Sequence, residues 1–142
     1  MIILDTNVLS ALMRQSPELP VVEWLDQQQA DSVWITSVTL FEARFGLAML
    51  PKGKRRQSLE TAFARLLVED LEDRVLAFDT SAATEAAVLA ADRQKAGRLV
   101  DFRDTQIAGI ALSRRATLAT RNTRHFQDLR VPVVDPWLAR IR

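Results

Sequence analysis

The sequence contains no cysteine, and it has a single histidine, His125. The absence of cysteine excludes disulfide bonds and thiolate metal sites, so side-chain oxygens remain as the main candidate metal ligands. No apolar run approaches the roughly 20 residues that a membrane-spanning helix needs. The apolar run that starts at Ile2 is interrupted by Asp5, and we find no secretory signal. We therefore expect a cytoplasmic protein with no membrane partner.

The charge of the chain is nearly balanced, with 19 basic and 18 acidic residues and a net charge of +1. Overall charge therefore gives no argument for nucleic-acid binding, which would have to depend on local clusters of charge. A hydrophobic content of 48% and a charged content of 26% are typical of a globular protein. We find no repeat or linker, and the length suits one domain, residues 1–142.

Short runs of β-favouring residues alternate with helical patterns along the whole chain. We predict strands at residues 2–4, 32–36, 75–78, 116–120 and 131–134. We predict helices after Asn7, after Pro20, and over about 37–50, 58–71, 80–97 and 101–113. This alternation predicts an α/β fold with a parallel sheet covered on both faces. The last strand is predicted at an edge of the sheet, because Pro132 has no N–H group to donate.

The first predicted strand runs directly into Asp5, which is followed by Thr6 and the first helix. Asp5 would therefore lie at the carboxyl end of a buried strand, where ligand sites are found in open α/β sheets. The alternative is that Asp5 or Thr6 only caps the helix, since both residue types are favoured at that position.

One predicted helix face carries an acid among apolar residues, at spacings of four, three and four: Val38, Glu42, Phe45 and Met49. We expect this face to lie against the core, where an unpaired carboxylate is costly and has to be neutralised or bind a cation. The alternative is a partly exposed Glu42 that pairs with Arg44 or Arg103.

A second predicted helix repeats this pattern. Its shared face consists of Asp104, Ile107, Ala108 and Ala111, and Asp101 lies three residues before Asp104. Both aspartates could instead cap the helix and interact favourably with its dipole. Asp104 fits this alternative less well than Asp101, because it heads the apolar face rather than preceding the helix.

The fourth predicted strand ends in Thr120, and Arg121 and Asn122 follow at the same predicted edge. Asn122 can offer a carbonyl oxygen or an N–H donor but no charge, and asparagine is also a common turn residue. His125 is a candidate general base, although a lone histidine in a loop is more often a surface residue that forms hydrogen bonds. The basic residues 52–56 are predicted as a turn, which either follows a phosphate backbone or is simply solvated.

Asp5, Glu42 and Asp104 can converge at one edge of the predicted sheet. Like charges at short distance raise one another's pKa unless a cation lies among them. Oxygen ligands suit Mg²⁺ or Mn²⁺ rather than Zn²⁺, and such ions polarise phosphoryl groups and generate hydroxide from water. This combination indicates hydrolysis of a phosphodiester bond through a metal-activated water.

Four blocks of the sequence, taken together and in this order, resemble those of the PIN domain family: ILDTNVLSAL, TLFEARFGLAML, VDFRDTQIAGIAL and LATRNTRHF. The resemblance covers nearly the whole chain and is closest to the VapC/FitB-type toxins of bacterial toxin–antitoxin pairs. It implies a three-layer α/β/α fold and an endoribonuclease that depends on Mg²⁺ or Mn²⁺.

The resemblance also assigns roles to individual residues. Asp5, Glu42 and Asp104 match the three core acids of the family, and Thr6 matches its hydroxyl position. Asp5 and Asp104 would bind the metal ion directly, and Glu42 directly or through a water. Asn122 stands where many members carry a fourth acid, so a second metal position would lose a charge. Thr6 and Asn122 would orient ligands or the water.

The resemblance further implies a homodimer, an RNA substrate and a cognate antitoxin that occludes the acidic groove and carries the DNA-binding part. Two other functions stay open at this point. One is a catalytically inactive PIN-like binding module, for which Asn122 is an argument. The other is a phosphatase of the haloacid dehalogenase type, since Asp5 follows a first strand. That chemistry needs a second acid two residues later, where this chain has Asn7.

Overall fold

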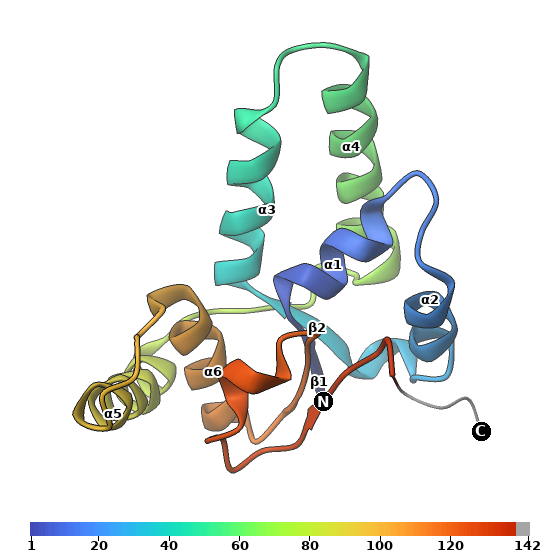
Figure 1. Cartoon of the computed structure of the whole chain (residues 1–142). Coiled ribbons are helices and arrows are strands. Elements are labelled where there is room, and N and C mark those ends of the chain that lie inside the picture. Colours follow the sequence, from blue (N-terminus) through green and yellow to red (C-terminus); the bar gives the residue numbers. More distant parts are fainter. Residues whose placement is uncertain (139–142) are drawn as a thin grey trace.

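The computed structural model describes residues 1–138, so residues 139–142 of the predicted domain lie outside the described part. Within it, a five-stranded parallel sheet forms the middle layer, with the order β3-β2-β1-β4-β5 (Figure 1). The strands are β1 Ile2–Leu4, β2 Val33–Thr36, β3 Val75–Leu76, β4 Thr117–Ala119 and β5 Val133–Val134. The predicted α/β class, with a parallel sheet of about five strands, is confirmed.

The central strand of the sheet is β1, which pairs with β2 on one side and β4 on the other. Its side chains alternate between the two faces, so that Ile3 lies in one apolar cluster and Leu4 in the other. Both side chains are buried, which explains why the sequence of this strand is continuously apolar. The strand that follows Pro132, β5, lies at an edge, as predicted.

Six α-helices lie within residues 1–138: α1 Thr6–Met13, α2 Leu19–Asp26, α3 Ser37–Met49, α4 Lys54–Arg65, α5 Thr80–Lys95 and α6 Phe102–Arg114. Three shorter helical segments are η1 Ala30–Ser32, η2 Leu66–Asp70 and η3 Thr123–Phe126. The helices α5 and α6 pack on the face of the sheet that carries Ile3, and α1, α2 and α4 pack on the face that carries Leu4. The predicted three-layer α/β/α sandwich is therefore confirmed.

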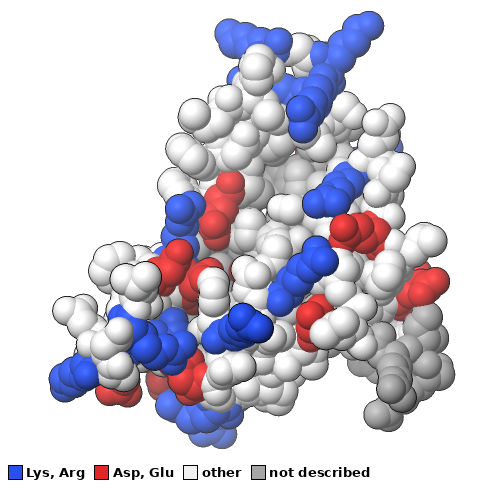
Figure 2. All heavy atoms as spheres, in the orientation of Figure 1, with Lys and Arg blue, Asp and Glu red and all other residues white. Residues whose placement is uncertain are grey.

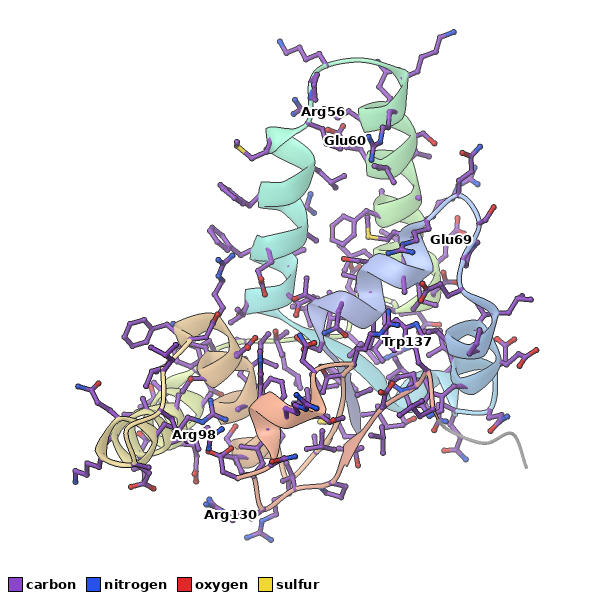
Figure 3. The ribbon with its side chains drawn as sticks, in the orientation of Figure 1. Arg56, Glu60, Glu69, Arg98, Arg130 and Trp137 are labelled. Atoms are coloured by element: carbon purple, nitrogen blue, oxygen red, sulfur yellow. The ribbon has the colours of Figure 1, made fainter. Side chains whose placement is uncertain are left out.

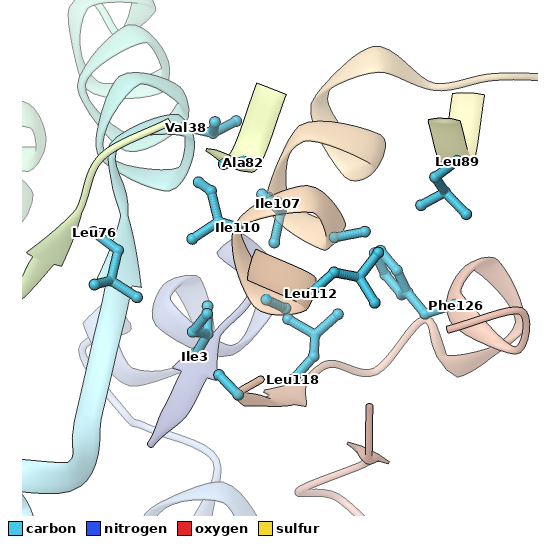
Figure 4. Close-up of a cluster of buried hydrophobic side chains, with 13 residues drawn as sticks. Ile3, Val38, Leu76, Ala82, Leu89, Ile107, Ile110, Leu112, Leu118 and Phe126 are labelled. Carbon is cyan, nitrogen blue, oxygen red and sulfur yellow. The ribbon is translucent and has the colours of Figure 1, made fainter. Parts of the chain in front are cut away.

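The helix α6 is buried between the sheet and α5 (Figure 4). Its side chains Ile107, Ala108 and Ala111 are fully buried, as its apolar pattern predicts. Gly109 allows the close approach of α5, because a Cβ atom there would lie 2.6 Å from the carbonyl oxygen of Ala82. This packing fixes the first turn of α6, which carries Asp104, at the carboxyl edge of the sheet.

The helices α3 and α4 rise from the sheet side by side (Figure 1). The apolar face predicted on α3 does not lie against the core along its whole length. Val38 is buried, but Phe45 is 53% exposed and Met49 is 69% exposed. The prediction was wrong for the outer part of the helix, because α3 extends beyond the sheet and its described neighbours pack on the side of Leu47.

The helix α4 begins earlier than predicted. It starts at Lys54, so the second half of the predicted basic turn, residues 52–56, forms the first turn of this helix. Near its end the α-helix gives way to η2, a π-helical segment that places Leu67 in the core. None of the helices within residues 1–138 has the length and apolar character needed to cross a membrane.

Candidate active site at the carboxyl edge of the sheet

Asp5 lies where β1 ends, and only 4% of it is exposed. Its backbone N–H donates to the carbonyl oxygen of Ala119, which ends β4 (2.9 Å). Its Oδ1 accepts from the backbone N–H of Thr6 (2.8 Å), and its Oδ2 accepts from Thr120 Oγ1 (2.7 Å) and Asn7 Nδ2 (3.3 Å). Asp5 therefore caps α1, and its carboxylate also lies in a buried polar network larger than a cap requires.

Burial raises the pKa of the Asp5 carboxyl from its ordinary value of 3.8 to about 6. The hydrogen bonds from Thr120 and Thr6 lower this pKa, whereas the negative charges of Asp104 and Glu42 raise it. The structure thus brings Asp104 of α6 and Glu42 of α3 within electrostatic range of Asp5 at the end of β1.

Glu42 reaches this edge from α3. Its Oε1 accepts a hydrogen bond from Thr6 Oγ1 (2.8 Å), and the same hydroxyl lies 3.0 Å from Thr39 Oγ1. Its Oε2 lies 3.5 Å from Arg103 Nη1, so the ion pair that the sequence offered as an alternative is present. The Glu42 carboxylate is therefore held by Arg103 of α6 through one oxygen and by Thr6 through the other.

Asp104 lies in the first turn of α6, and its backbone N–H donates to Asp101 Oδ1 (3.1 Å). Asp101 is thus the cap of the helix, which leaves the Asp104 carboxylate available for other contacts. Asp104 Oδ2 lies 3.0 Å from His125 Nδ1. His125 is exposed, as expected for a surface histidine, but its ring contacts an acid of the candidate site.

Two threonines of this site were given no role from the sequence: Thr39, and Thr120, which was noted only as the end of a predicted strand. The buried Thr120 hydroxyl donates to Asp5 and accepts from Asn7 Nδ2 (3.2 Å) and from the backbone N–H of Asn122 (3.1 Å). The sheet register explains this position, because Leu4 pairs with Ala119 and the next residues lie side by side. Asn122 enters the network through its backbone, so the role predicted for its side chain stays a prediction.

The sequence matches the model of the PIN domain family over residues 2–131. The chain belongs to the PIN domain family. It is 35% identical over 137 residues to the VapC ribonuclease Y4jK of Sinorhizobium fredii, covering 96% of this chain and 98% of that protein. It is 34% identical over 137 residues to the toxin FitB of Neisseria gonorrhoeae, covering 96% and 99%. The solved structure of FitAB bound to an IR36 DNA fragment matches it with a TM-score of 0.89 at 32% identity, covering 100% of this chain and 99% of that one.

The acidic edge of this PIN domain offers carboxylate and hydroxyl oxygens, which are the ligands that Mg²⁺ and Mn²⁺ prefer. No group of three or more acidic or histidine side chains within residues 1–138 forms a ready metal-binding cluster. Burial is the main cause of the raised pKa of Asp5, and the repulsion from Asp104 and Glu42 that adds to it is of the kind that a divalent cation relieves. An ion that keeps several of its waters needs fewer protein oxygens than such a cluster supplies.

Proposed function

We propose that this chain is the toxin of a toxin–antitoxin pair and that it hydrolyses phosphodiester bonds of RNA with the help of Mg²⁺ or Mn²⁺. The observation that carries the proposal is the buried Asp5 carboxylate, whose pKa is raised by burial and further by the charges of Asp104 and Glu42. Ionisable groups perturbed in this way gather at functional sites. The relatives named as a ribonuclease and as a toxin support the same function.

The acids of the site would bind the metal ion, and its hydroxyl groups would orient the acids. Asp5 and Asp104 would hold the ion directly, and Glu42 directly or through a water. When bound, the ion would neutralise charge on the phosphate and make a water molecule more acidic. The Thr6 hydroxyl, which donates to Glu42 Oε1, would orient that carboxylate. A role of Asn122 in orienting a ligand or a water is supported by its place in the family pattern.

The charges on this face suit a phosphate backbone. Lys and Arg side chains are interspersed with the acidic side chains on this face, and a further group of Lys and Arg side chains lies at the tip of the α3–α4 pair (Figure 2). We further propose a homodimer, and a cognate antitoxin that covers the acidic groove and binds DNA for the pair. The FitAB complex with DNA supports such an assembly. Exposed Phe41 and Phe45 on α3 offer an apolar surface for protein partners.

Asp5→Asn tests the proposal, with Asp79→Asn as the matched control. Both aspartates cap a helix, and asparagine caps a helix about as well as aspartate. Asp5→Asn is expected to slow RNA cleavage in Mg²⁺ by roughly 100-fold or more, since even the partners of metal ligands contribute 10- to 100-fold. Cells that express the unmodified toxin are expected to stop growing, and Asp5→Asn should relieve this arrest. Asp79→Asn should still cleave RNA and still arrest growth.

Other outcomes would favour other functions. Cleavage at full rate by Asp5→Asn would contradict the roles assigned to the acids. If the unmodified chain neither cleaves RNA nor binds Mn²⁺ at millimolar concentration in calorimetry, the chain is an inactive binding module. A covalent phosphate on Asp5 would indicate a phosphatase, although Asn7 stands in place of the second acid that such chemistry needs.

A further inference from the structure

Arg93, in the last turn of α5, is only 4% exposed, although an arginine side chain keeps its positive charge in proteins. A buried guanidinium is costly unless both its charge and its N–H groups are satisfied. The function proposed above makes no use of this residue, so its burial needs an explanation.

Two parts of the chain satisfy the guanidinium. In the segment after β4, Asp128 Oδ2 accepts from Nε (2.8 Å), Asp128 Oδ1 accepts from Nη2 (2.9 Å), and the carbonyl oxygen of His125 also accepts from Nη2 (2.7 Å). In α6, Thr105 Oγ1 accepts from Nη1 (3.2 Å). The hydrogen bonds from Arg93 hold the pKa of Asp128 below its ordinary value, so this carboxyl is charged.

Both of these parts belong to the candidate active site. Thr105 directly follows Asp104, and its hydroxyl donates to the carbonyl oxygen of Asp101 in the same helical turn (2.7 Å). His125 places Nδ1 3.0 Å from Asp104 Oδ2. The Arg93 guanidinium therefore joins the backbone of His125 to the helical turn that carries Asp104. The side chains of His125 and Asp104 contact each other directly.

The segment that carries His125 depends on anchors outside itself. The 3₁₀ helix η3 has only four residues, and so short a helix has few hydrogen bonds of its own. Phe126 fixes one side of this segment in the apolar core (Figure 4). Arg93 fixes the polar side through the His125 carbonyl group and the Asp128 carboxylate. Removing the polar anchor would leave the segment attached but free to shift.

We propose that Arg93 is a positioning residue of this site, which holds residues 123–128 against the first turn of α6 and so keeps the His125 imidazole on the Asp104 carboxylate. The effect on catalysis rests on the function proposed above, whereas the geometric effect does not. Arg98 provides a contrast, because its Nη1 reaches the same Asp128 carboxylate (3.0 Å) from the solvent side, with a side chain that is 42% exposed (Figure 3).

The sequence makes a spectroscopic test direct, because its single histidine gives one imidazole Cε1–H signal in a ¹H–¹³C NMR spectrum of the untagged chain. Arg93→Lys and Arg98→Lys each keep the charge and lose the planar fork of the guanidinium. Arg93→Lys is expected to shift and broaden the His125 signal, because an ammonium group cannot reproduce four hydrogen bonds to two segments. Arg98→Lys is expected to leave the signal in place.

RNA cleavage gives a second measurement on the same two variants. Arg93→Lys is expected to lower kcat by about 10-fold or more, as for other residues that orient a metal ligand. KM should stay within about twofold, because the variant changes the orientation of Asp104 rather than a contact with RNA. Arg98→Lys should change neither constant.

An unchanged His125 signal in folded Arg93→Lys would overturn the proposal, and a shifted signal with unchanged kcat would overturn the role in catalysis. If circular dichroism shows that Arg93→Lys does not fold, Asp128→Asn takes its place. This variant should also shift the His125 signal, and an unchanged signal would again overturn the proposal. If the unmodified chain does not cleave RNA, the proposed function fails, while the NMR comparison still decides whether Arg93 positions His125.

Discussion

The helices α3 and α6 have similar sequence patterns and different surroundings. Each has 13 residues, and each carries one acid of the candidate site on a face that is otherwise apolar. In α6 this face is buried, and Ile107 and Ala108 have no exposed surface. In α3 the corresponding Phe45 and Met49 are more than half exposed. The same periodicity therefore accompanies two opposite environments.

The difference teaches that residue spacing identifies a shared helix face but not the layer that covers it. The helix α6 lies between α5 and the sheet, so apolar side chains surround it. The helix α3 leaves the sheet after its first turns, so its outer face is open to another molecule (Figure 1). Exposed apolar side chains that lie together are typical of a surface that binds a partner.

Truncating one apolar side chain on each helix should show the largest difference. Ile107→Ala is expected to lower the free energy of unfolding by roughly 2–5 kcal/mol, because it leaves a cavity in a fully buried position. Met49→Ala is expected to change it by less than about 0.5 kcal/mol. Urea unfolding at several protein concentrations measures both. A loss for Met49→Ala as large as that for Ile107→Ala at every protein concentration would contradict the comparison, whereas a loss that depends on protein concentration would show that a second copy covers α3.

The burial of Asp5, and to a smaller extent the acids of the two helices, raises the pKa of Asp5 and makes stability depend on pH. The Asp5 pKa of about 6 in the folded chain exceeds its ordinary value of 3.8, so the folded chain binds this proton more tightly than the unfolded chain. The contribution to the free energy of unfolding is therefore complete below pH 3.8 and falls as the pH rises to about 6, by about 3 kcal/mol in total. Unfolding without metal across this range measures the fall.

Variants of the acids sharpen this test. Asp5→Asn should remove the fall in stability. Asp104→Asn should reduce it more than Glu42→Gln does, because the charge of Asp104 contributes more than that of Glu42 to the raised pKa of Asp5. The reverse order would show that α3 rather than α6 carries the acid nearer to Asp5.

The two helices also carry one glycine each, and alanine at these positions should have small effects of opposite sign. Gly109→Ala is expected to lower the free energy of unfolding by about 1–3 kcal/mol, because the added Cβ would lie 2.7 Å from the Ala86 Cβ atom. Gly46→Ala should raise it by about 0.5–1 kcal/mol, since no described atom lies within 4 Å of the added Cβ. Thermal unfolding measures both, and changes of the same sign would contradict the contrast.

Features of the fold that depend on a few neighbouring residues could be predicted from the sequence. Continuous apolar residues before Asp5 indicated a buried strand, Pro132 indicated an edge, and Asp101 indicated a cap. The exposure of the outer face of α3 could not be predicted, because it depends on where the sheet ends beneath the helix. The π-helical end of α4 gave no signal in the apolar pattern either.

In the candidate site too, features that depend on neighbouring residues could be predicted, and features that depend on tertiary packing could not. The position of Asp5 at the end of β1 could be read from the strand itself. The hydrogen bond from Thr120 to Asp5 could not, because it joins residues 115 positions apart and depends on the pairing of β1 with β4. The pair of Arg93 and Asp128 spans 35 positions and depends on how α5 packs on α6. Side chains that orient the acids are thus chosen by tertiary packing, which a local pattern does not contain.

The central place of β1 has a consequence for protein synthesis. A ribosome makes β1 and Asp5 before any other strand of the sheet, yet Thr120, which holds the Asp5 carboxylate, follows 115 residues later. The growing chain therefore cannot complete the pairing on both sides of β1 until β4 has left the exit tunnel. If the chain cuts RNA, it acquires that ability only after Thr120 has emerged and can hold the Asp5 carboxylate.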